Sequence, residues 1–62
     1  MIESKTRRQI IAIAKKQIAE IDQFFADAEH YNSTRTVFEH VNPDPDGLIM
    51  EFRSALEKTV SA

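Results

Sequence analysis

The sequence predicts an all-α fold: a helical hairpin with a long first helix and a shorter second one. Three observations lead to this prediction. The first 31 residues contain neither Gly nor Pro, apolar residues recur there at steps of three and four, and both prolines and the only glycine fall within residues 42–47. Such spacing places apolar side chains on one face of a helix, whereas a strand needs alternation by two. At 62 residues, the chain is expected to form one small helical domain, residues 1–62.

The first helix is expected over residues 4–31, a segment rich in good or neutral helix formers. Its apolar positions alternate steps of three and four, which is the a/d pattern of a helix that packs against other helices. Three further apolar side chains, Ile10, Phe24 and Tyr31, widen this stripe on one flank. The stripe itself comprises Ile11, Ala14, Ile18, Ile21, Phe25 and Ala28.

The triplet at residues 32–34, Asn-Ser-Thr, weakens the helix signal. Side chains of these types compete for backbone hydrogen bonds and favour caps and turns. Either the first helix ends near Asn32 and a short helix follows over about 34–41, or the first helix continues to about Val41. We favour the break followed by a short helix.

Residues 42–47, Asn-Pro-Asp-Pro-Asp-Gly, form the clearest break in the chain. Asp44 is suited to cap the next helix, and Pro45 to occupy its first position. A second helix is therefore expected over residues 45–60. Within it, Phe52 and Leu56 are expected to close the hairpin or a larger bundle.

Charge is segregated along the first helix. Residues 1–19 carry five basic side chains and one acidic one, a balance of +4, whereas residues 20–31 carry four acidic side chains and no basic one, a balance of −4. This order opposes the helix macrodipole, which favours acids at the start of a helix and bases at its end. An antiparallel second copy of the helix would place each basic half along an acidic half.

The expected assembly is an antiparallel homodimer, a four-helix-type bundle with a two-fold axis near residues 19 and 20. In this register Ile11 would meet Ala28 of the other copy, so that large residues face small ones. The expected interface residues are Ile11, Ala14, Ile18, Ile21, Phe25, Ala28, Phe52 and Leu56. So short a chain buries little core alone, which favours this dimer over a monomeric three-helix bundle.

Nothing in the sequence indicates an enzyme, and we assign no catalytic, cofactor-binding or metal-binding residues. The chain has no cysteine, which excludes disulfides and thiolate metal ligands. Asn42, Asp44 and Asp46 have the spacing of the first half of an EF-hand calcium loop, but Arg53 stands where the loop needs a bidentate Glu. A capped turn is the favoured interpretation of this segment.

The favoured function is therefore non-enzymatic: a small interaction, regulatory or assembly protein that acts as a homo-oligomer through helix faces. The alternative is a small nucleic-acid-binding regulator that uses the basic start of the first helix, a weaker hypothesis because the net charge is −2. We expect no membrane association, since no apolar run reaches the length of a membrane span. With no signal-peptide pattern at residues 1–5, a cytoplasmic location is expected.

Overall fold

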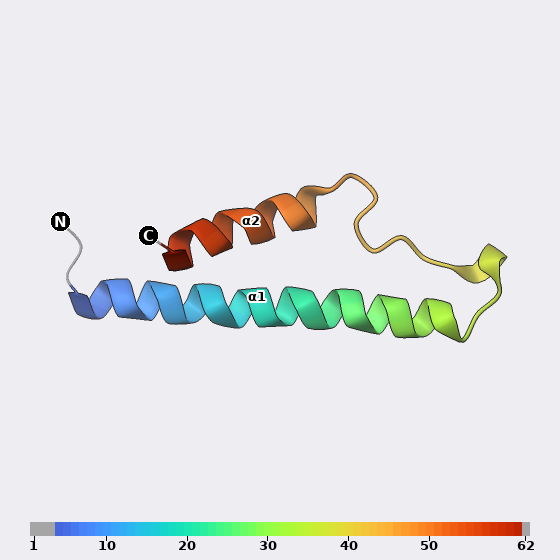
Figure 1. The fold of residues 1–62 in the computed structure, drawn as a ribbon, viewed down its shortest axis with the longest axis horizontal. Coiled ribbons are helices and arrows are strands. Elements are labelled where there is room, and N and C mark those ends of the chain that lie inside the picture. The colour runs from blue at the N-terminus through green and yellow to red at the C-terminus, as the bar shows by residue number, and fades with distance from the viewer. Residues whose placement is uncertain (1–3, 62) are drawn as a thin grey trace.

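The computed structural model describes residues 4–61. They form two antiparallel helices, α1 (Ser4–Ser33) and α2 (Leu48–Ser61), joined by a segment that holds one short 3₁₀ helix, η1 (Val37–Glu39) (Figure 1). There is no strand in this part of the chain. The prediction of an all-α helical hairpin is confirmed, and the intermediate helix is a single 3₁₀ turn.

The two helices pack along the apolar stripe of α1. Ala14 is 2 % exposed and is the only buried residue in the part that the structure describes. The remaining stripe residues are half-buried, and on α2 the half-buried residues have the same helical spacing. They are Ile11, Ile18, Ile21, Phe25 and Ala28 on α1, and Ile49, Arg53, Leu56 and Val60 on α2.

The molecule is one layer of helices. Its principal extents are 52 × 19 × 12 Å, and the smallest matches the diameter of a single helix, about 10–12 Å. The radius of gyration is 15.4 Å, whereas a compact domain of this length has about 10.6 Å. Folded domains usually stack two layers around a core, and this chain supplies one.

The polar triplet ends α1, two residues later than the sequence predicts. The hydroxyls of Ser33 and Thr34 donate to the carbonyl oxygens of His30 and Tyr31, at 2.7 and 2.9 Å. These bonds satisfy carbonyl groups that have no partner within the helix.

Asn32 fixes the connection that follows. Its side-chain amide donates to the carbonyl of Val41 at 2.9 Å, and its side-chain carbonyl accepts the N–H of Val41 at 2.8 Å. The connecting segment is thereby held against the end of α1.

The start of α2 combines a glycine with a remote carboxylate. Gly47 has φ +75°, a left-handed conformation that glycine adopts readily, so the helix begins at Leu48 and not at the expected residue 45. The carbonyl of Gly47 accepts the N–H of Glu51 at 3.1 Å. Because glycine has no side chain to cap the helix, the Asp44 carboxylate does so, accepting the N–H groups of Ile49 and Met50 at 3.1 Å each.

Replacing Asp44 should therefore destabilise the hairpin. We expect Asp44→Ala to lower the free energy of unfolding by about 1 kcal/mol, the typical cost of losing an N-terminal cap. Urea unfolding followed by circular dichroism would measure the change. The matched control is Asp46→Ala in the same turn, which should have a smaller effect, and equal losses for both variants would contradict the capping role of Asp44.

Candidate interaction surface

Two rows of α1 residues flank the stripe that packs on α2, and each row has a seven-residue spacing. We call Arg8, Lys15, Asp22 and Glu29 the charged row, and Ile10, Gln17, Phe24 and Tyr31 the apolar row. Residues seven apart lie almost one above the other on a helix, and the two rows lie about 160° apart around α1, since neighbouring residues are offset by about 100°. The rows therefore point to opposite sides of the hairpin.

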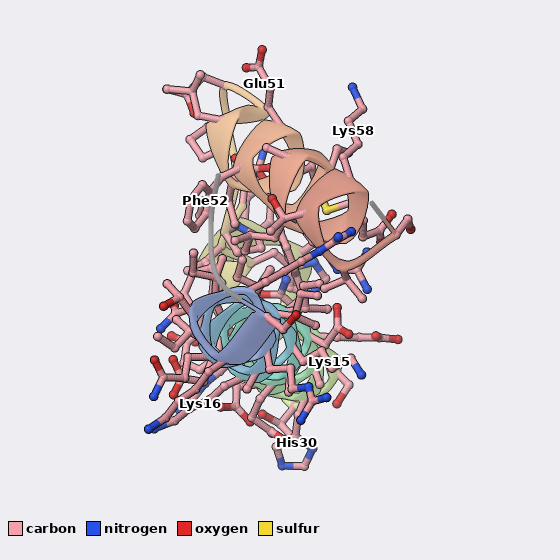
Figure 2. The ribbon with its side chains drawn as sticks, turned by 90° about the vertical axis from the view of Figure 1, so that its left-hand side faces the viewer. Lys15, Lys16, His30, Glu51, Phe52 and Lys58 are labelled. Atoms are coloured by element: carbon pink, nitrogen blue, oxygen red, sulfur yellow. The ribbon has the colours of Figure 1, made fainter. Side chains whose placement is uncertain are left out.

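Figure 2, which looks along α1 from its N-terminal side, shows the directions in which Lys15 and Phe52 point. Lys15 of the charged row points to one side of the pair of helices, and Phe52 of α2 points to the other side. Because the apolar row lies across α1 from Lys15, it shares its side of the hairpin with Phe52. Leu48, one turn before Phe52, lies on that side too.

One side of the hairpin is consequently apolar and open to solvent. Ile13 lies about three turns before Phe24 and belongs to the same side. The fraction of each residue's surface that is exposed to solvent is 61 % for Ile13, 46 % for Phe24 and 54 % for Phe52. We call this surface the apolar face; its residues are Ile10, Ile13, Phe24, Tyr31, Leu48 and Phe52, all of them exposed.

The opposite side carries the ion pair that joins the helices. The Arg53 guanidinium donates to both carboxylate oxygens of Asp22, at 2.8 and 3.1 Å, and also pairs with Glu57. The hydrogen bond from Arg53 lowers the pKa of Asp22 below its usual value and raises the pKa of Arg53. Met50 is the one large apolar side chain of α2 that points to this side and is exposed in the described chain.

The expected interface residues fall into two groups. The six on α1 form the stripe that faces α2 and, toward the end of α1, the connecting segment of the same chain (Figure 1). Leu56 is half-buried against α1, whereas Phe52 is exposed on the apolar face. Their assignment to an interface between two copies stays a prediction.

Sequence reasoning missed the role of Arg53. It placed the acidic half of α1, which holds Asp22, along the basic half of a second copy, and it did not foresee that Asp22 binds Arg53 within the chain. The spacing of Ile49, Leu56 and Val60 around Arg53 is the signal that could have placed Arg53 on the inner face of α2.

The basic side chains at the start of α1 are exposed, and four of them, Lys5, Arg8, Lys15 and Lys16, lie within about 100° around the helix. By helical geometry Arg7 lies on the side toward α2, whereas Lys5 and Lys16 lie on the side away from it. The use of these residues to bind nucleic acid stays a prediction.

The acidic turn before α2 is engaged in backbone contacts. Both carboxylate oxygens of Asp44 cap α2, and the side-chain oxygen of Asn42 accepts the N–H of Asp44 at 3.1 Å. Within residues 4–61, no three His, Cys, Asp or Glu side chains gather where they could hold a metal ion. The calcium-like spacing is thus explained by helix capping.

Comparisons with protein-family models, with curated proteins and with solved structures found no match. Neither described helix combines the length and the apolar character that crossing a membrane requires.

The Asp22–Arg53 pair makes hairpin stability depend on pH. Because the pKa of Asp22 is lowered on folding, the ion pair stabilises the hairpin above the ordinary carboxyl value of 3.8, and this contribution is lost as the pH falls through the lower folded value. We expect Asp22→Asn to be less stable than the parent at pH 7 and to lose less stability between pH 5 and pH 2. Thermal unfolding across this range would measure both effects.

The control is Asp27→Asn, which removes a carboxylate of the same helix that accepts a hydrogen bond from the uncharged Gln23. If both variants lose the same amount of stability between pH 5 and pH 2, the pH dependence is set by the net charge of the chain and not by the pair with Arg53.

Proposed function

We propose that this protein is a non-enzymatic helical interaction or assembly protein that works as a homodimer. The observation that carries the proposal is the apolar face. A soluble monomer seldom exposes a continuous apolar patch of large side chains, and such patches mark surfaces that bind other proteins. Here six large apolar side chains lie exposed on one side of two helices.

The amount of exposed surface supports association. The accessible surface is 5154 Å², whereas a compact monomer of 7.1 kDa has about 4,100 Å². The excess of about 1,000 Å² resembles the roughly 800 Å² that each partner contributes to a stable interface. A second layer of helices on the apolar face would bring the exposed surface into the usual range.

A second copy of the chain is the partner that the charges favour. Within residues 4–31, α1 carries only bases before residue 20 and only acids from residue 20 onward, His30 aside. Antiparallel copies place opposite charges together, which contributes little energy but selects orientation. The proposal includes a cytoplasmic location, which the absence of cysteine favours.

The oligomeric state tests this function. Size-exclusion chromatography with light scattering at tens of micromolar should give about twice the 7.1 kDa chain mass. Sedimentation equilibrium over a dilution series should show a monomer–dimer equilibrium. A mass of one chain throughout that series would refute the proposed homodimer.

A further inference from the structure

The further inference specifies the surface and register of the proposed homodimer, and it rests on that proposed function. We propose that the second copy seats its own apolar face on this one, about a two-fold axis that crosses α1 between residues 20 and 21. In this arrangement α1 lies antiparallel on α1 of the partner, and the first turns of the two α2 helices meet close to the axis. The stripe of α1 stays on its own α2, and the apolar row makes the contact between copies.

The apolar row is symmetric about this axis. Reversing the row about a point between residues 20 and 21 places Ile10 opposite Tyr31 of the partner subunit, and Gln17 opposite Phe24 of the partner subunit. Tyr31 and Phe24 are both exposed in the single chain. Every member of the row therefore gains a partner from the other copy, and the Phe24 side chains of the two copies lie on either side of the axis.

The start of α2 lies near the same axis. In the hairpin, α2 runs antiparallel to α1 from just beyond the middle of α1 toward its N-terminal end, and the last third of α1 extends past α2 beside the connecting segment (Figure 1). An axis between residues 20 and 21 of α1 therefore passes nearer to the start of α2 than to its middle. Leu48 and Phe52, near that start, are turned toward the other copy.

Charge distinguishes this axis from the other two-fold axis that could stack the apolar faces. An axis parallel to the helices would place α1 on α2 of the partner, whose charged residues, Glu51, Arg53, Glu57 and Lys58, cancel. The basic half of α1 would then lie against a helix with no net charge. The proposed axis, which is perpendicular to the helices, places the basic half of α1 along the acidic half of the partner's α1. Opposite charges then face each other, as they do in complementary protein surfaces.

Glu20 is the residue that reports on this register. It lies close to the axis and toward the apolar face, about 40° around α1 from Phe24. Packed helices lie about 9 Å apart and their Cα atoms lie about 2.3 Å from each axis. Two copies of residue 20 that face each other are therefore separated by about 5 Å, within the roughly 4.4–6.8 Å that a disulfide spans.

Single cysteines in this cysteine-free chain test the register. Glu20→Cys should form a disulfide-linked dimer in nearly full yield under mild oxidation, as seen on non-reducing gels. The matched control is Ala19→Cys, the neighbouring exposed position, which points away from the proposed contact and should give at least tenfold less linked dimer. Light scattering on the reduced variants should give the dimer mass for both.

The outcomes separate the two proposals. If the reduced variants are dimers but Glu20→Cys links no better than Ala19→Cys, the face and register are wrong and the homodimer stands. If the reduced variants and the parent chain have the mass of one chain, the homodimer itself is wrong, and the apolar face belongs to a different partner.

A second pair of variants tests the face independently of cross-linking. Phe24→Gln should raise the dissociation constant of the dimer more than tenfold, because it removes a large apolar side chain from the centre of the contact. Lys15→Gln, in the charged row on the opposite side, should change it less than threefold. Circular dichroism would establish that both variants keep the helical content of the parent, and similar dissociation constants for the two would overturn the assignment of the face.

Discussion

Two helices lying side by side can bury only the strip between them, and this constraint governs the whole molecule. In residues 4–61 that strip encloses one buried residue, Ala14, whose small side chain lets α1 and α2 approach. The sides of the hairpin remain open whatever residues they carry. Packing within the chain therefore does not explain why one side is apolar and the other is charged, and this contrast is the basis for the proposed association.

The ion pair and the apolar face have complementary roles. Asp22 and Arg53 pair at the edge of the contact between the two helices, where a solvent-accessible ion pair contributes little energy but limits how far α2 can shift along α1. The apolar face provides apolar surface for burial but no ion pair that fixes the position of α2. The relative positions of its α1 and α2 residues therefore depend on the Asp22–Arg53 pair. The charge order of α1, unfavourable for an isolated helix, becomes favourable when a second α1 runs the other way.

Local chemistry made most of the fold predictable from the sequence. The long stripe indicated α1, and the Asn-Ser-Thr triplet indicated its end, because the side chains themselves make the terminating bonds. The start of α2 was misjudged by three residues, since Pro45 is compatible with a first helical position and only the backbone shows that Gly47 has a positive φ. Three residues of the apolar row were recognised from the sequence as a widening of the stripe. That these residues lie beside α2 and not under it could not be predicted, because it depends on which face of α2 packs on α1, and Arg53 lies on that face.

The hydrogen bonds between Asn32 and Val41 also bear on how fast the hairpin forms. A connection that spans residues 34–47 would ordinarily have to be ordered at the moment when the helices meet. Here Asn32 closes its first part across nine residues, and Asp44 orders its last part from within the turn. Most of the conformational entropy is thus lost in short, local steps, and the contact of α1 with α2 closes a much shorter loop. Chains dominated by such local contacts fold rapidly, in microseconds to milliseconds, so we expect the hairpin to assemble before two chains can meet.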